Sequence, residues 1–286
     1  MSNIAPIVRA ETSEKPTVIA LHCSGATGAQ WGQLERELSQ SYEVIAPDMI
    51  GSGSAPSWSG RRAFRLTDEA ARIVAIVDRA KQPVHLVGHS YGGCVALRVA
   101  VERPSKIASM CLYEPSAFHL LKATDDAGLA AFGEVNTLGK EVARLVSSGD
   151  HFAAAKLFYD YWNGAGCWAA MRAESRDAFV RYIPKACLEI SAALGERVPF
   201  HAYQRLNVPL LLLQGEYAPA STQMIANQLA KVMRQASIRT IVGAGHHGPF
   251  SHPTVISAMI ADWIVASKPK VPTAERPTSQ TIERVA

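Results

Sequence analysis

A serine with glycines on both sides is the residue of this chain best suited to chemistry. Ser90 lies between Gly88 and Gly92, after an apolar run and before a segment typical of a helix. On a sharp strand-to-helix turn a serine hydroxyl is exposed for attack, and glycines leave room for the neighbouring backbone. We therefore predict a buried strand at residues 84–87, a helix from residues 94–101, and Ser90 as a nucleophile.

A serine nucleophile needs a neighbouring base to take its proton, and histidine is the usual one. A strand-like run at residues 238–242 leads into a glycine-rich loop that carries His246. A serine on a strand-to-helix turn is typically followed, far downstream in the chain, by the histidine that acts as its base. We predict His246 as the base. His247 has no such pattern, and His252 before Pro253 is explained by helix capping or packing.

Two N-terminal segments complete a pattern of motifs. Residues 17–21 form an apolar run into His-Cys-Ser-Gly at residues 22–25, and residues 47–53 read Pro-Asp-Met-Ile-Gly-Ser-Gly. Together with the serine and histidine motifs, and in this order, the chain resembles the α/β-hydrolases. The resemblance covers nearly all of residues 5–265. These motifs are specific to the fold and not to a substrate.

The resemblance implies roles for several further residues. In the family, two backbone N–H groups bind the oxyanion that forms during acyl transfer. The matching groups here are the N–H of Ser24 and that of Tyr91, with Cys23 standing where the family usually has glycine. The same resemblance implies a structural role for Asp48.

The acid of the triad departs from the commonest family pattern. Ala218 stands where an aspartate usually follows the next-to-last strand, and alanine cannot orient an imidazole. Glu114 ends an earlier strand and resembles the acid of the haloalkane dehalogenases; Glu216 is the alternative. A carboxylate at the carboxyl end of a core strand lies in the functional crevice. We predict Glu114 as the acid that orients His246.

The elements that position these residues alternate between strand and helix as far as Tyr113, which is typical of a parallel, doubly wound α/β sheet. The resemblance implies a mostly parallel, eight-stranded sheet flanked by helices, with a helical lid inserted after the sixth strand. We assign residues 1–115 and 206–266 to the core and residues 116–205 to the lid. The polar, proline-containing segment 267–286 is expected to be a disordered tail.

The expected lid is rich in aromatic side chains, some of which must face Ser90 and form one wall of the pocket. An aromatic pocket favours hydrophobic acyl or aryl groups. The aromatic residues of this segment include Phe132, Phe152, Phe158, Tyr159, Tyr161, Trp162, Trp168, Phe179 and Tyr182.

Composition restricts the partners. The 286 residues are 48% hydrophobic and carry a net charge of +4 without a basic block, which argues against nucleic acid. No apolar stretch is long enough for a membrane span, and the first residues lack signal-peptide features, so a cytoplasmic location is expected. The 5 cysteines lack the spacing of a zinc site or a disulfide framework. Neither a cofactor nor a metal is implied, and the oligomeric state is left open.

These observations predict a serine hydrolase that cleaves a small or medium hydrophobic carboxylic ester through an acyl-enzyme. Hydrolysis of a carbon–carbon bond in a ring-cleavage dienone is the alternative within the fold. Dehalogenase and epoxide-hydrolase chemistry are disfavoured, because both rely on an aspartate nucleophile where this chain has Ser90. A ligand-binding protein with little turnover is an alternative from another class, and a carboxylate that reaches His246 would argue against it.

Overall fold

The computed structural model describes residues 15–123 and 125–267 of the chain. The strands are β1 (Thr17–Leu21), β2 (Glu43–Ile45), β3 (Val84–His89), β4 (Ile107–Tyr113), β5 (Leu210–Gly215) and β6 (Ala236–Ile241). The α-helices are α1 (Gly32–Leu38), α2 (Leu66–Arg79), α3 (Tyr91–Glu102), α4 (Asp126–Ser147), α5 (His151–Asn163), α6 (Cys167–Ala170), α7 (Ala173–Leu194), α8 (Phe200–Gln204), α9 (Ala220–Val232), α10 (Gly248–Ser251) and α11 (Pro253–Ala266). Short 3₁₀ helices are η1 (Gly28–Trp31), η2 (Pro104–Lys106) and η3 (Phe118–Ala123).

The strands form one sheet in the order β2-β1-β3-β4-β5-β6, and every neighbouring pair is parallel. The strand order reverses at β1, since β2 lies on one side of it and β3 on the other. In open α/β sheets the crevice at the carboxyl ends of the strands beside such a reversal is the usual ligand site. The carboxyl ends of β1 and β3 lead into His22 and Ser90.

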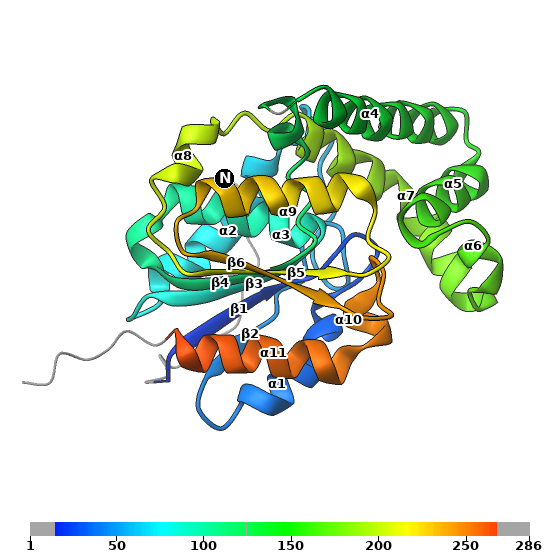
Figure 1. The fold of residues 1–286 in the computed structure, drawn as a ribbon. Coiled ribbons are helices and arrows are strands. Elements are labelled where there is room, and N and C mark those ends of the chain that lie inside the picture. Colours follow the sequence, from blue (N-terminus) through cyan, green and yellow to red (C-terminus); the bar gives the residue numbers. More distant parts are fainter. Residues whose placement is uncertain (1–14, 124, 268–286) are drawn as a thin grey trace, which may run out of the picture.

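Alternating side chains of each strand build a core on both faces of the sheet. In β1, Val18 and Ala20 join the core under α1 and α11, whereas Ile19 and Leu21 join the core under α2, α3 and α9. Figure 1 shows these two helical layers on opposite faces of the sheet. Because successive strand residues point to opposite faces, a strand buried on both sides must be apolar throughout. All residues of β1 are buried.

The predicted parallel α/β sheet is confirmed, but the predicted number of eight strands is wrong for the described residues, which form a 6-stranded sheet. The number eight came from the family resemblance, and the described sequence has no further run that pairs with an edge strand. The helical segment accordingly follows β4, and not a sixth strand.

Between β4 and β5 the described chain contains helices only, from η3 to α8. Helices α4, α5 and α7 pack on one another, and α7 also contacts α2 and α3 of the core. In Figure 1, α5, α6 and α7 lie beyond the ends towards which β5 and β6 point. This helical segment therefore lies at the end of the sheet to which Ser90 belongs.

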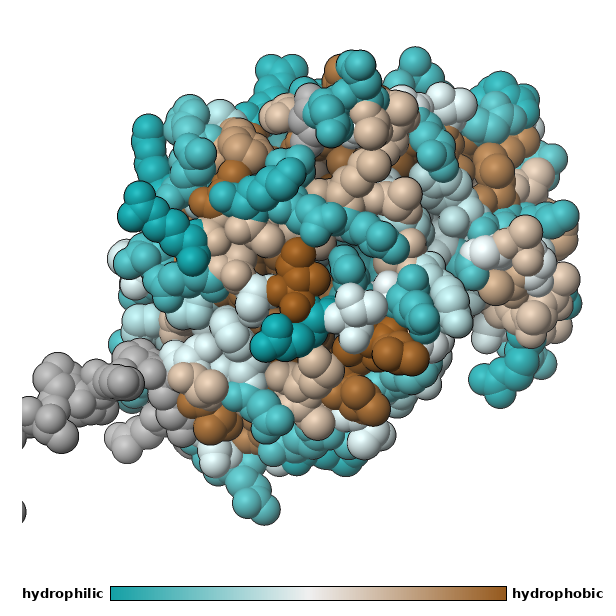
Figure 2. Space-filling model, viewed as in Figure 1, coloured by the Kyte–Doolittle hydropathy of each residue, from teal (hydrophilic) through white to brown (hydrophobic). Residues whose placement is uncertain are grey.

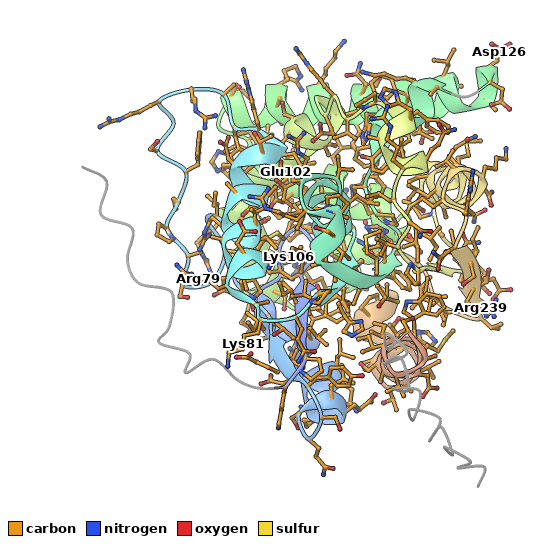
Figure 3. The ribbon with its side chains drawn as sticks, turned by 90° about the vertical axis from the view of Figure 1, so that its left-hand side faces the viewer. Arg79, Lys81, Glu102, Lys106, Asp126 and Arg239 are labelled. Carbon is orange, nitrogen blue, oxygen red and sulfur yellow. The ribbon has the colours of Figure 1, made fainter. Side chains whose placement is uncertain are left out.

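The surface is mixed in character. Figure 2 shows hydrophilic and hydrophobic residues interspersed over one face. On the side drawn in Figure 3, Arg79, Lys81 and Lys106 lie at the connections that enter β3 and β4, which is the end of these strands opposite to Ser90. Among the described residues, no helix is both long enough and apolar enough to span a membrane.

Candidate active site

Ser90 occupies a strained turn between β3 and α3. Its backbone has φ 53° and ψ −116°, and a positive φ is uncommon for any residue other than glycine. An added Cβ at Gly92 would lie 2.5 Å from the carbonyl oxygen of His22, and one at Gly88 would lie 2.7 Å from that of Gly92. Both glycines are thus required sterically, and the turn presses the start of α3 against the end of β1.

Three side chains predicted from distant parts of the sequence meet at this turn. The Ser90 hydroxyl lies 3.0 Å from His246 Nε2, and His246 Nδ1 lies 2.7 Å from Glu114 Oε2. Their exposed fractions are 8% for Ser90, 5% for His246 and 0% for Glu114. With a proton on Nδ1, His246 donates to Glu114 and its Nε2 accepts the hydrogen of Ser90. This is the arrangement that general-base activation of a serine requires.

Glu114 is held by the ends of two strands. Its backbone has φ 43°; among the described residues, only Ser90 shares a positive φ without being glycine. Its Oε1 accepts the N–H of Gly215, 2.8 Å away at the end of β5. The Thr222 hydroxyl lies 3.2 Å from Oε2 and 2.8 Å from the carbonyl oxygen of Pro219, and its single hydrogen serves one of them at a time. Strain of this kind persists only where the surroundings fix it, and it is common at functional sites.

The alternative acid, Glu216, lies elsewhere. Its side chain is exposed, and its Oε2 accepts the N–H of Gly243 at 2.8 Å. Ala218, at the position the family gives to an aspartate, is 8% exposed. The structure therefore brings Glu114, and not Glu216, to His246.

The loop after β1 is organised by His22 and Gln30. His22 is fully buried; its Nδ1–H donates to the carbonyl of Cys23 at 2.8 Å, and its Nε2 accepts the N–H of Met49 at 3.0 Å. Burial lowers the pKa of His22, although the hydrogen bond to Cys23 opposes this, so the ring suits a neutral structural role. The Cys23 N–H donates to Gln30. The oxyanion roles of Ser24 and Tyr91 stay predictions.

One other sequence prediction concerns a residue near this loop. Asp48 accepts the N–H of Gly28 and that of Ser54, each at 2.9 Å, and so joins two loops. Burial raises the pKa of Asp48, but these hydrogen bonds outweigh it and the net pKa is lowered. Burial raises the pKa of the Cys23 thiol strongly, which makes it a poor nucleophile.

Sequence reasoning missed two residues at the site, Ser116 and His89, and named Trp162 only as one of several aromatic residues of the expected lid. The Ser116 hydroxyl lies 3.1 Å from that of Ser90. The ring centroid of Trp162, from α5, lies 5.1 Å from that of His246 at an interplanar angle of 32°. His89 Nε2–H donates to the carbonyl of His246 at 2.9 Å and fixes its loop. His89 could have been suspected from its place beside Ser90; the position of Trp162 carries no comparable local signal.

A cavity of about 310 Å³ opens beside His246. Its walls come from α5 and α6 on one side and from the loop of residues 245–247 on the other, and they include Tyr159 and Met171. Ser90 is not among the lining residues, so the cavity reaches the site from the His246 side. The Tyr159 hydroxyl lies 3.3 Å from His247 Nδ1. Burial, with a smaller contribution from His246, lowers the pKa of His247 to about 4.

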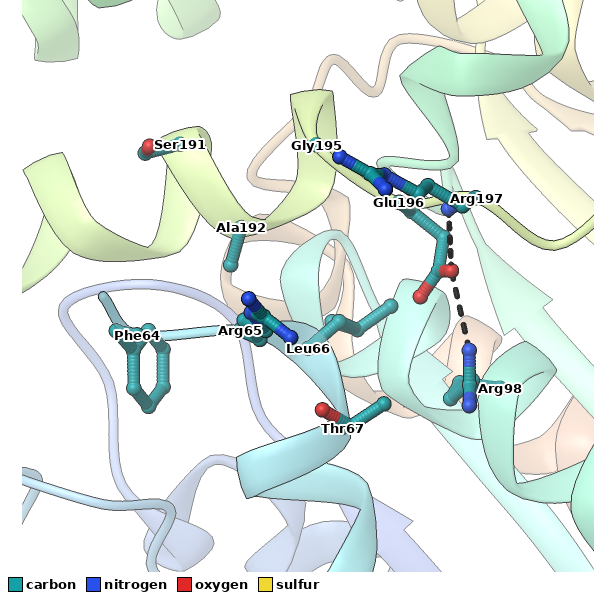
Figure 4. A pocket seen from close by; sticks show the side chains of 10 residues that line it. All are labelled: Phe64, Arg65, Leu66, Thr67, Arg98, Ser191, Ala192, Gly195, Glu196 and Arg197. Carbon is teal, nitrogen blue, oxygen red and sulfur yellow. Dashed lines mark hydrogen bonds and ion pairs between the residues drawn. The ribbon is translucent and has the colours of Figure 1, made fainter. Parts of the chain in front are cut away.

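A second cavity, of about 290 Å³, lies away from these residues (Figure 4). Its walls come from the start of α2, from α3 and from the end of α7, and they include Arg98. Arg98 forms ion pairs with Glu102 and Glu196, so its charge is already compensated. No predicted site residue lines this cavity. Within the described chain, no group of three or more His, Cys, Asp or Glu side chains is placed to hold a metal ion.

Comparison with known proteins identifies the family of the chain. The model of the alpha/beta hydrolase family matches residues 18–259, and the chain belongs to that family. It is therefore a hydrolase.

The chain is 26% identical over 258 residues to the pimeloyl-[acyl-carrier protein] methyl ester esterase of Neisseria meningitidis serogroup B, covering 86% of this chain and 92% of that protein. It is 29% identical over 202 residues to a putative carbamate hydrolase, RutD, of Variovorax paradoxus, covering 64% and 75% of the two chains. Among solved structures, an alpha/beta hydrolase enzyme from a Medee basin deep-sea metagenome library superposes with a TM-score of 0.75 at 15% identity, covering 91% of this chain and 92% of that one.

Proposed function

We propose that this protein hydrolyses small or medium hydrophobic carboxylic esters through an acyl-enzyme on Ser90. One observation carries the proposal: the buried chain of hydrogen bonds from Ser90 through His246 to Glu114. A carboxylate that holds the imidazole in the correct tautomer distinguishes a catalytic serine from an incidental one. The same contact argues against a binding protein that has lost activity.

In the proposed reaction, Ser90 Oγ attacks the ester carbonyl carbon while its proton passes to His246 Nε2. Glu114 stabilises the imidazolium that results. The tetrahedral intermediate collapses, and His246 returns the proton to the departing alcohol. A water molecule then gives its proton to His246 and attacks the acyl carbon, which releases the acid and restores the Ser90 hydroxyl.

The oxyanion of both intermediates would form at the N-terminus of α3. This helix spans 12 residues and begins directly after Ser90, so its dipole favours negative charge at this end. We propose the N–H groups of Tyr91 and Ser24 as the donors. The Cys23 N–H is already bonded to Gln30, which is consistent with leaving this task to the next residue.

The substrate class follows from the surroundings of His246. A cavity of about 310 Å³ is at the small end of the usual range for ligand sites and suits a small or medium group. Trp162, with an exposed fraction of 6%, covers the imidazole. We propose residues 116–205 as a lid that forms the apolar wall of the pocket and that must move to admit substrate. A relative named as a methyl ester esterase supports the ester class.

The test of the nucleophile is Ser90→Ala, assayed with p-nitrophenyl esters of increasing acyl length. Loss of a triad serine costs several orders of magnitude, so we expect kcat/KM to fall by at least about 10³-fold with an unchanged thermal midpoint. Ser39→Ala, at an exposed serine outside the site, is the matched control and should keep full activity. If Ser90→Ala retains more than about a hundredth of the rate, Ser90 is not the nucleophile.

The test of the lid compares two aromatic residues of α5. Trp162→Leu should alter the ratio of kcat/KM between short-chain and long-chain esters, because the Trp162 ring contacts His246. Phe152→Leu is the control, since Phe152 is 57% exposed, and it should leave the ratio unchanged. An unchanged ratio in both variants would remove the support for a lid that selects substrates.

A further inference from the structure

The segment that follows β4 reaches the proposed catalytic group at two points. Glu114 contacts His246 from one side, and two residues later Ser116 lies 3.1 Å from Ser90 Oγ on the other. We infer that Ser116 is a further catalytic residue. Its hydroxyl donates a hydrogen bond to Ser90 Oγ and stabilises this oxygen when the bond between Oγ and the acyl carbon breaks. The inference rests on the proposed function.

The backbone fixes the position of Ser116. The Ser90 N–H donates to the carbonyl of Tyr113 at 2.9 Å, and the Ser116 N–H donates to the carbonyl of Ser90 at 3.0 Å. Pro115 lies between these two contacts and packs closely on α3. A Cβ added at Gly93 would lie 2.8 Å from the Cβ of Pro115. The two hydroxyls are therefore held together by main-chain contacts, which substitution of the Ser116 side chain leaves intact.

Counting protons gives the direction of the hydrogen bond. His246 donates its Nδ1–H to Glu114, so its Nε2 can only accept, and the acceptor takes the single hydrogen of Ser90. Ser116 must then be the donor to Ser90 Oγ. Both serines are buried, with exposed fractions of 5% for Ser116 and 8% for Ser90. In a buried site a hydroxyl without a partner is costly, and the reactive oxygen is the partner within reach.

The donated bond has different consequences in the two halves of the reaction. During acylation, Ser90 Oγ loses a proton and gains a bond to carbon, while negative charge grows on the carbonyl oxygen. During deacylation, the bond between the acyl carbon and Oγ breaks, and its electron pair moves to Oγ as His246 Nε2–H returns the proton. Oγ carries similar partial negative charge when it attacks and when it leaves, but the two steps start from different oxygens. The hydroxyl oxygen of free Ser90 already accepts the bond from Ser116, whereas the ester oxygen of the acyl-enzyme is a weak acceptor, so this preorganised donor gains more when Oγ leaves. Ser116 keeps its own proton throughout.

The experiment is stopped-flow hydrolysis of p-nitrophenyl acetate by wild type, Ser116→Ala and Ser116→Thr, with intact-mass detection of the acyl-enzyme. Loss of one hydrogen bond corresponds to about a tenfold change in rate. We expect Ser116→Ala to slow deacylation about tenfold and acylation less than threefold, so that acyl-enzyme accumulates and both kcat and KM fall. Ser116→Thr keeps the hydroxyl and should restore deacylation.

Equal slowing of both steps, or a Ser116→Thr variant no better than Ser116→Ala, would overturn the inference and leave Ser116 with a structural role. Unchanged rates in Ser116→Ala would overturn it as well. Failure of the proposed function has a different signature, since ester hydrolysis would then survive Ser90→Ala.

Discussion

The ends of β4 and β5 each carry a glutamate, and the two side chains lie in opposite environments. Glu114 is fully buried, has a positive φ and contacts His246, whereas Glu216 is exposed and bonds to the N–H of Gly243. Neighbouring parallel strands end at the same edge of the sheet, so both glutamates start near the imidazole. The difference arises in the turns that follow, because a strained turn directs Glu114 inwards. Backbone direction, and not distance along the chain, decides which carboxylate becomes the acid.

The largest difference between the end of β4 and the end of β5 is expected when each glutamate is replaced by glutamine and the rates are compared. Glu114→Gln should lower kcat/KM by about 10⁴-fold, because the amide no longer selects the correct imidazole tautomer. Glu216→Gln changes an exposed side chain and should alter the rate less than threefold, a size typical of surface substitutions. Initial rates with one p-nitrophenyl ester are sufficient. The reverse ranking would move the acid to the end of β5.

A smaller effect tests whether the two strand ends are interchangeable. Introducing Ala218→Asp into Glu114→Gln places a carboxylate where the family commonly has one. Ala218 is 8% exposed and follows the β5 end, which itself contacts Glu114 through Gly215. We expect recovery of about 10- to 100-fold in kcat/KM, since orientation is regained without the original geometry. Ala218→Asn is the control without charge. No recovery above that control would show that only the β4 turn directs a carboxylate at His246.

The smallest effect concerns two other histidines, of which His119 is buried and His247 is half-buried. Burial lowers the pKa of His119 and that of His247 to about 4, from the ordinary histidine value of about 6.5. Between about pH 4 and about pH 6.5 the unfolded chain binds more protons than the folded protein does. The free energy of unfolding is therefore highest above about pH 6.5 and falls as the pH falls. We expect urea denaturation to give an unfolding free energy lower by roughly 2 kcal/mol or more at pH 5 than at pH 7. His119→Gln should reduce this difference, and equal stabilities at the two pH values would contradict the assignment.

The sequence predicted the parts of the site that local pattern defines. Ser90 was recognised because its glycines and flanking elements are contiguous, and His246 because a strand and a glycine-rich loop precede it. The parallel sheet followed from alternating elements and apolar strands. The predicted strand number is wrong because it rests on the family resemblance and not on apolar runs in the chain.

The remaining contacts depend on tertiary placement. The choice between Glu114 and Glu216 had physical support in the sequence, but the strained turn that separates them has no local signature. Ser116 and Trp162 matter only because β4 ends beside β3 and because α5 lies over the imidazole. No periodicity or motif distinguishes them from ordinary polar and aromatic residues of a helical segment.

The most direct measurement of the central claim is the rate and location of labelling by a serine-directed phosphonate, followed by peptide mass spectrometry. Phosphonylation requires the activated nucleophile and does not depend on recognition of a particular ester substrate. Wild type and Glu216→Gln are predicted to be labelled on Ser90 at the same rate, and Glu114→Gln on Ser90 at least about 100-fold more slowly. Labelling at another residue, or slow labelling of Glu216→Gln together with normal labelling of Glu114→Gln, would contradict a triad of Ser90, His246 and Glu114.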